Sequence, residues 1–190
     1  MAVTIDMTKS LVIIDMQTWF FRTEDRSAKL PWLLSGINKL VPGFVSGNLP
    51  VIVVRTMFSS DQSTWDQYMR AHNKAVLIEN TPSAKDVDGL ILPEKVSTIF
   101  KTRHSTFIRT DFEKMLRHMN ITSLVLAGAF VDGCVGLTAI DAWERDFQVT
   151  IAKDAVVSTE EEQGDAMLRF LNVEFGIEIL THREILNNLS

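Results

Sequence analysis

Cysteine is nearly absent from this chain, and its scarcity excludes several classes of protein. Cys134 is the single cysteine among 190 residues. One thiol cannot form an intramolecular disulfide and does not supply the repeated cysteine spacing of a zinc site. A scaffold held together by internal disulfides is therefore excluded, and a reducing compartment is favoured.

Long hydrophobic runs and an excess of basic residues are also lacking. No apolar stretch approaches the length that spans a bilayer, and the first residues do not combine a basic region with a long apolar segment and a cleavage site. The net charge is -5, whereas nucleic-acid-binding domains are usually basic. We therefore expect a cytoplasmic protein without membrane or nucleic-acid partners.

The chain does contain an ordinary globular composition, with 46% hydrophobic and 23% charged residues, in a length that suits one domain over residues 1–190. Short apolar runs typical of buried parallel strands alternate with segments of helical periodicity. This alternation predicts a three-layer, Rossmann-like α/β fold with a six-stranded, mainly parallel sheet between helices. The predicted strands cover residues 10–16, 50–56, 96–101, 121–127, 147–152 and 175–180, and the predicted helices cover 25–45, 65–74, 112–119, 133–145, 160–173 and 182–189.

The stretch from residue 124 to 143 places Cys134 at a junction between a strand and a helix. An apolar run ends at Gly128, and apolar residues recur at three- and four-residue steps directly after Cys134. The free N–H groups and the dipole at a helix N-terminus favour an anion, and cysteines placed there have lowered pKa values. We therefore expect a reactive thiol, although a lone buried cysteine is more commonly a small apolar filler.

Two further reactive side chains stand at the ends of predicted strands. Asp15 closes the first strand and Lys101 closes the third. In a sheet of order 3-2-1-4-5-6, the first and fourth strands are neighbours, and the crevice where the sheet switches direction between them is the expected ligand site. Asp15 and Cys134 would face each other there, and the long side chain of Lys101 could reach them from two strands away.

These three groups suit nucleophilic catalysis. Asp15 can take the proton of the thiol, Lys101 can stabilise the thiolate, and Cys134 can attack a carbonyl carbon to form an acyl-enzyme. Backbone N–H groups before the helix can hold the oxyanion, and Asp15 can then protonate the leaving group and activate water. Taken singly, an aspartate at a strand end often only holds a turn, and a lysine there is usually solvated. The hypothesis depends on all three groups lying on one edge.

Residues 57–94 lack a regular pattern and separate the second and third predicted strands. A connection of this length is usually functional, so we expect either a lid over the site or a contact with another subunit. Several aromatic residues predict a partly aromatic pocket, namely Trp19, Phe20, Phe58, Trp65 and Phe130. A substrate carboxylate could be bound by Arg55, Arg103 or His104.

Three short motifs occur in order along the chain. Residues 15–20 read DMQTWF, residues 101–107 read KTRHSTF, and residues 128–135 read GAFVDGCV. They resemble the patterns D-x-Q-x-x-F, K-x-x-x-S-x-F and G-V-x-T-D-x-C-V of the isochorismatase-like cysteine hydrolases, a family that includes nicotinamidases and N-carbamoylsarcosine amidase. The resemblance runs from about residue 9 to residue 180.

The resemblance implies specific roles for the motif residues. It implies a catalytic triad of Asp15, Lys101 and Cys134, and a cis peptide before Phe130. The N–H groups of Phe130 and Cys134 would form the oxyanion hole. The substrate pocket would include Gln17, Phe20 and Phe130. The resemblance further implies a small-molecule substrate, no cofactor and a homodimer or homotetramer.

Departures from the family pattern reduce the range of activities that we expect. The metal-binding nicotinamidases carry Asp-x-His after the second strand, whereas residues 55–60 read RTMFSS here and His72 stands alone. We therefore expect no metal, and nicotinamide is a poor substrate candidate. True isochorismatases carry glycine where Cys134 stands, which argues against vinyl-ether hydrolysis.

The resulting hypothesis is a metal-independent cysteine hydrolase that cleaves a C–N bond in a small amide or carbamoyl compound through an acyl-enzyme. One alternative is a non-catalytic member that binds a small molecule or a protein in the same crevice. Slow alkylation of Cys134, with a pKa near the free value, would favour that alternative. The other alternative is an isochorismate-type ether hydrolase that does not use the thiol.

Overall fold

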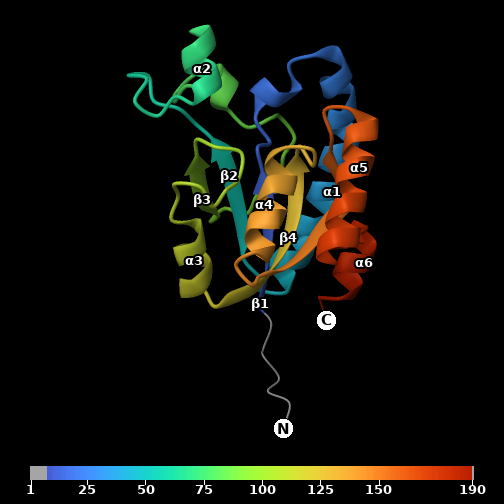
Figure 1. The fold of residues 1–190 in the computed structure, drawn as a ribbon. Coiled ribbons are helices and arrows are strands. Elements are labelled where there is room, and N and C mark those ends of the chain that lie inside the picture. Colours follow the sequence, from blue (N-terminus) through green and yellow to red (C-terminus); the bar gives the residue numbers. More distant parts are fainter. Residues whose placement is uncertain (1–7, 190) are drawn as a thin grey trace.

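The computed structural model describes residues 8–189 and shows one six-stranded sheet between two layers of helices (Figure 1). The sheet order is β3-β2-β1-β4-β5-β6, and all paired strands are parallel, which confirms the predicted topology. The strands are β1 (Thr8–Ile14), β2 (Val51–Thr56), β3 (Ser97–Lys101), β4 (Ile121–Ala129), β5 (Gln148–Val157) and β6 (Glu178–Leu180).

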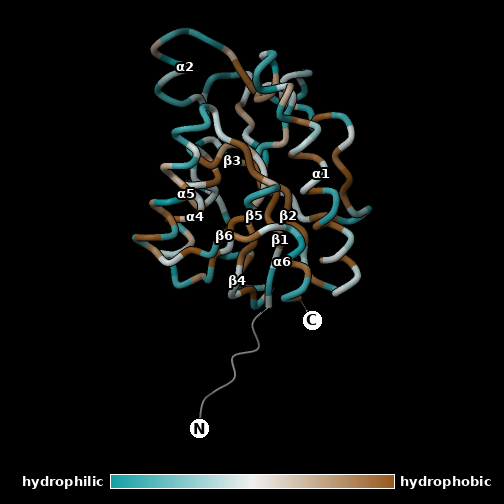
Figure 2. The backbone as a smooth tube through the Cα atoms, turned by 90° about the vertical axis from the view of Figure 1, so that its right-hand side faces the viewer, coloured by the Kyte–Doolittle hydropathy of each residue, from teal (hydrophilic) through white to brown (hydrophobic). Residues whose placement is uncertain are grey.

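The apolar composition of the central strands explains why both faces of the sheet are covered. In β1, Val12 and Ile14 pack into one core, whereas Leu11 and Ile13 pack into the other. Successive side chains of a strand point to opposite faces, so a continuous apolar run needs helices on both sides. Figure 2 shows the hydrophobic residues concentrated along the strands.

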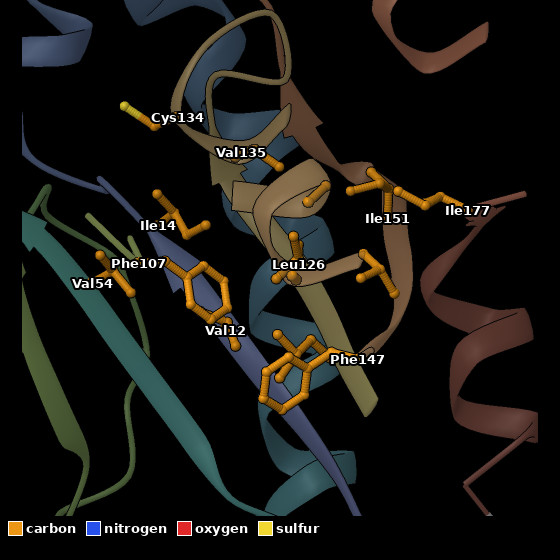
Figure 3. Packing of buried hydrophobic residues seen from close by; sticks show 14 of the residues in the cluster. Val12, Ile14, Val54, Phe107, Leu126, Cys134, Val135, Phe147, Ile151 and Ile177 are labelled. Atoms are coloured by element: carbon orange, nitrogen blue, oxygen red, sulfur yellow. The ribbon is translucent and has the colours of Figure 1, made fainter. Parts of the chain in front are cut away.

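The helices divide between the two cores. One core receives α1 (Glu24–Ser46) and α6 (His182–Asn187), and the other receives α3 (Phe112–His118), α4 (Cys134–Trp143) and α5 (Glu161–Phe175). Figure 3 shows the second of these cores, with Cys134 at its end and the sulfur directed away from the hydrophobic side chains of the core. None of the helices within residues 8–189 combines the length and apolarity needed to cross a membrane.

The segment between β2 and β3 is folded above the carboxyl ends of the strands (Figure 1). It contains α2 (Gln67–His72) and the 3-10 turn η2 (Pro82–Ala84), and it has a small core of Phe58, Trp65, Met69 and Leu77. A second 3-10 turn, η1 (Thr18–Phe21), follows β1. Neither 3-10 turn was predicted, because three or four residues show no periodicity.

Element boundaries differ from the prediction mainly at β5, which continues five residues beyond the predicted end at 152. The polar pair Lys153 and Asp154 interrupts the apolar run at that point. The pairing with β4 shifts register there, between Leu126 and Gly128. A bulge of this kind admits polar residues inside a strand.

Candidate active site

Asp15 is fully buried at the carboxyl end of β1 and has a left-handed backbone, with φ of 56°. Few non-glycine residues adopt this conformation, and those that do cluster at functional sites. The neighbouring strand comes very close, because a Cβ on Gly128 would lie 2.1 Å from the carbonyl oxygen of Ile14. Glycine at that position lets β4 bring its end, and the turn that follows, beside Asp15.

Lys101 connects the other two predicted catalytic residues, Asp15 and Cys134. Its Nζ lies 2.7 Å from Oδ2 of Asp15 and donates a hydrogen bond of 3.2 Å to Sγ of Cys134. The side chains of Asp15 and Lys101 are both fully buried. The structure thus brings Asp15, Lys101 and Cys134 together from β1, β3 and α4, as the strand order predicted.

Thr56, at the end of β2, holds this cluster together and was missed by the sequence analysis. Its hydroxyl donates to Oδ1 of Asp15 at 2.9 Å and accepts a hydrogen bond of 2.7 Å from Lys101. Its N–H lies 3.0 Å from the same Asp15 oxygen. The position of Thr56 in the sequence could have indicated this role, because it ends β2, which lies between the strands that carry Asp15 and Lys101.

Cys134 is the first residue of α4 and is 6% exposed. Its sulfur contacts Lys101 at the end of β3 and, at 3.5 Å, Nδ1 of His104 in the loop that follows. His104 is exposed and lines a cavity that Cys134 also lines. His104 was expected only as a ligand for a substrate carboxylate, and its contact with Cys134 was not predicted.

The thiol of Cys134 is held in its neutral form. Burial raises the pKa of Cys134, and the Asp15 carboxylate raises it further, against the opposing effect of Lys101. The expected lowering of the Cys134 pKa is therefore wrong, because burial and the facing Asp15 carboxylate raise this pKa. Burial alone would lower the pKa of Lys101, but Asp15 and then Cys134 raise it overall, so this ammonium stays charged.

The loop between β4 and α4 presents two backbone donors beside the thiol. A cis peptide joins Ala129 to Phe130. Within residues 8–189, the N–H groups of Phe130 and Cys134 donate no hydrogen bond to another part of the chain. The loop is anchored by Asp132, whose carboxylate accepts the N–H and the hydroxyl of Thr159. Both donors are therefore held in place and free to bind an incoming oxygen.

A cavity of about 890 Å³ opens onto Cys134. Of the predicted aromatic pocket residues, Trp19, Phe20, Phe58 and Phe130 line it. The ring centroids of Phe20 and Phe130 lie 6.0 Å apart in an edge-to-face arrangement. Residues 66–68 and 71–72, in and beside α2, form part of its wall. Part of the segment that was expected to be a lid or a subunit contact thus lines the cavity of its own chain, and the subunit contact stays a prediction.

Three predicted pocket residues lie elsewhere. The amide of Gln17, which is fully buried, does not face the cavity, because it donates to the carbonyls of Thr56 and Ala84 and accepts the Thr56 N–H, each at 2.9 Å. Trp65 is buried in the small core beneath α2. Arg55 is paired with Asp86 at 2.5 Å and is not available for a substrate carboxylate.

The side chains at the position of the family's metal ligands do not suit a metal ion. The hydroxyl of Thr56 already bridges Asp15 and Lys101, and Phe58 carries no donor atom. Within residues 8–189, no three His, Cys, Asp or Glu side chains form a potential metal site. The donor set after β2 therefore does not fit the metal of the metal-binding nicotinamidases.

Comparison with known sequences identifies a family. The model of the isochorismatase domain matches residues 9–184. An uncharacterised isochorismatase family protein, PncA of Bacillus subtilis, is 40% identical over 86 residues, or 41% of this chain and 47% of that protein. The chain thus spans about half the length of this relative. YecD of Escherichia coli O157:H7, also an uncharacterised isochorismatase family protein, is 29% identical over 96% of both chains.

Comparison with solved structures gives the same fold. The nicotinamidase/pyrazinamidase PncA from Bacillus subtilis superposes with a TM-score of 0.79 at 26% identity, covering 92% of this chain and 100% of that one. N-carbamoylsarcosine amidase from Thermoplasma acidophilum superposes with a TM-score of 0.78 at 21% identity, covering 93% of this chain and 97% of that one. The second likeness concerns the fold alone.

Proposed function

The chain belongs to the isochorismatase family of hydrolases, and we propose that it is a cysteine-dependent amidohydrolase that cleaves a C–N bond in a small amide or carbamoyl compound. The observation that carries this proposal is the placement of Lys101, whose Nζ lies 2.7 Å from Asp15 and 3.2 Å from Sγ of Cys134. This single ammonium group joins a carboxylate and a thiol at the cavity.

Acylation begins from a protonated thiol. The Asp15 carboxylate takes the proton of Cys134 as the sulfur attacks the carbonyl carbon, so charge leaves the carboxylate only when the substrate is in place. The N–H groups of Phe130 and Cys134 donate to the oxyanion of the tetrahedral intermediate. Asp15 then returns its proton to the leaving nitrogen, ammonia or an amine departs, and a thioester on Cys134 remains.

Deacylation reverses the roles. Asp15 removes a proton from water, and the hydroxide attacks the thioester carbonyl. The second tetrahedral intermediate collapses, the carboxylic acid product leaves, and Asp15 returns the proton to the sulfur. Lys101 remains protonated throughout and offsets the negative charge that moves between Asp15 and Cys134. No step requires a metal ion, which agrees with the poor metal donor set after β2.

The names of the relatives support an amide substrate. The solved structure at 26% identity is that of a nicotinamidase, which is an amidase by name. The cavity volume of about 890 Å³ lies within the usual range for small-molecule sites.

The test is ammonia release from a panel of amides, ureas and carbamoyl compounds, measured for the wild-type protein and for Cys134→Ala. We expect turnover of at least one compound by the wild type and a loss of at least about 10³-fold in the variant, because the nucleophile is removed. Circular dichroism should show that the variant remains folded. Full activity of Cys134→Ala would refute the mechanism, and a folded wild-type protein that turns over no compound would favour a binding module.

Slow alkylation by iodoacetamide no longer separates these two alternatives. The raised pKa of Cys134 predicts a slow reaction in the resting enzyme, whether or not the protein is catalytic. Turnover and acyl-enzyme formation are the discriminating observations.

A further inference from the structure

Four cationic side chains line the cavity without an ionic partner. Arg22, Arg26, Lys74 and Arg103 all border it, and none of them forms an ion pair with any residue in 8–189. This concentration of positive charge occurs in a chain whose net charge is -5. It therefore does not reflect the overall composition.

The acidic side chain that lines the same cavity does not neutralise these cations. Asp66 is the N-cap of α2, and its carboxylate accepts the N–H of Met69 at 2.7 Å. Asp15 is engaged with Lys101 and Thr56 beneath the cavity. None of the four cations therefore has a carboxylate within ion-pair distance among residues 8–189.

Arg22 and Arg26 lie four positions apart in the sequence, Arg22 directly after η1 and Arg26 in the first turn of α1. The guanidinium of Arg22 lies 3.7 Å from the centroid of Trp19 and donates to its carbonyl, while that of Arg26 lies 5.0 Å from the centroid of Phe130. Burial lowers the pKa of Arg22, and repulsion from Arg26 lowers it further. Two like charges held together beside an open cavity are stabilised when an anion binds between them.

The position of Arg26 relates this charge to the reacting centre. Arg26 lies over the ring of Phe130, whose N–H is one of the two proposed oxyanion donors. Phe20 meets the same ring edge-to-face and lines the cavity. A small planar molecule bound in this cavity beside Phe20 and Phe130 can place one end at Cys134 and the other at the guanidinium groups.

We propose that the substrate is an anion, an amide that also carries a carboxylate, with the carboxylate bound by Arg22 and Arg26 and the amide at Cys134. This inference rests on the proposed amidohydrolase function and adds the charge of its substrate. Guanidinium forks match carboxylates in a bidentate geometry, and within residues 8–189 the Arg26 side chain forms no hydrogen bond that would compete with a ligand. Neutral amides of the same shape leave the two arginines facing each other unpaired.

The test uses two ligands of the same shape and different charge, 3-carbamoylbenzoate and its neutral counterpart isophthalamide. Their dissociation constants are measured by calorimetry with the Cys134→Ala protein, which cannot turn them over. We expect the anion to bind at least about tenfold more tightly, and we expect added salt to reduce the difference. Equal affinities, or no detectable binding of the anion, overturn the proposal.

Two arginine variants in the same background locate the effect. Arg26→Gln should reduce the preference for the anion to about twofold or less. Arg183→Gln makes the same charge change on exposed α6, outside the cavity lining, and should leave the preference intact. A preference that survives Arg26→Gln assigns the charge selection to other residues and refutes this site.

Because binding is measured without turnover, the inference and the proposed function can fail separately. Anion preference without ammonia release from the wild-type protein would overturn the hydrolase mechanism alone. Turnover of neutral amides without anion preference would overturn the anion site alone.

Discussion

Two groups of cations line the cavity that opens onto Cys134, and they differ in what surrounds them. Lys101 is 1% exposed and has three partners in addition to the sulfur, namely Asp15, Thr56 and the carbonyl of Arg103. Arg22 and Arg26 lie across the cavity and face no carboxylate within residues 8–189. The comparison separates a charge that is built into the catalytic machinery from charges that are available to a ligand.

The difference also has an energetic meaning. Removing one partner of a buried ion pair lowers the free energy of unfolding by several kcal/mol, because the remaining charge has neither solvent nor a partner. An unpaired cation at a cavity wall contributes little to folding and can even oppose it through repulsion. Stability should therefore respond to changes around Lys101, whereas ligand affinity should respond to changes around Arg26.

The largest expected effect comes from breaking the buried side. Lys101→Met leaves the Asp15 carboxylate buried and unpaired, so the free energy of unfolding should fall by about 3–5 kcal/mol. Urea denaturation measures it. The double variant Lys101→Met/Asp15→Asn removes the orphaned charge and should recover most of the loss. A single-variant loss below about 1 kcal/mol would contradict the assigned pairing.

A smaller loss is expected from Thr56→Val, which removes the hydroxyl that bridges Asp15 and Lys101. Because two buried charged groups each lose a hydrogen bond, unfolding should become easier by about 1–3 kcal/mol. Thr122→Val is the matched control, since the buried hydroxyl of Thr122 has no partner in the described chain. The control should be neutral or stabilising, and equal losses in the two variants would refute the bridging role.

The raised pKa of Cys134 predicts a loss of stability in alkaline solution. Its folded-state pKa lies above the unfolded value, so the stabilisation is complete below about pH 8.5 and is lost as pH rises above it. Between about pH 8.5 and 10, the loss should approach about 1.4 kcal/mol per pH unit. Urea denaturation under reducing conditions measures this slope. Cys134→Ala should show a shallower slope, and identical slopes would contradict a protonated thiol.

The smallest effect on stability should come from the unpaired side. Arg26→Gln removes a charge that has no ionic partner and is repelled by Arg22, so the free energy of unfolding should change by no more than about 0.5 kcal/mol. The same denaturation experiment measures it. A loss above about 1 kcal/mol would show that Arg26 is structural, and the distinction between the two groups of cations would fail.

The sequence was sufficient for the sheet and for the ends of its strands. Short runs of strand-forming residues predicted all six strands, and the order 3-2-1-4-5-6, which was taken from the doubly wound fold, is the order that the structure shows. The placement of Asp15, Lys101 and Cys134 on one edge follows from that topology. The isochorismatase family was recognisable from three motifs that end or follow these strands.

Properties that depend on several elements at once were not predictable. The pKa of Cys134 is raised by burial and by Asp15, which lies 119 positions earlier and whose approach is created by folding. Thr56 has no motif of its own, and its bridging role appears only when β2 lies between β1 and β3. Gln17 belongs to a recognised motif, but its amide forms hydrogen bonds with backbone groups of two other segments.

The most direct test of the catalytic account is the intact mass of the wild-type protein, quenched in acid during turnover of an amide identified by ammonia release. The account predicts an added mass equal to the acyl group, mapped by peptide digestion to Cys134 and absent in Cys134→Ala. Steady turnover without any adduct, with the same rate in Cys134→Ala, would contradict attack by the thiol.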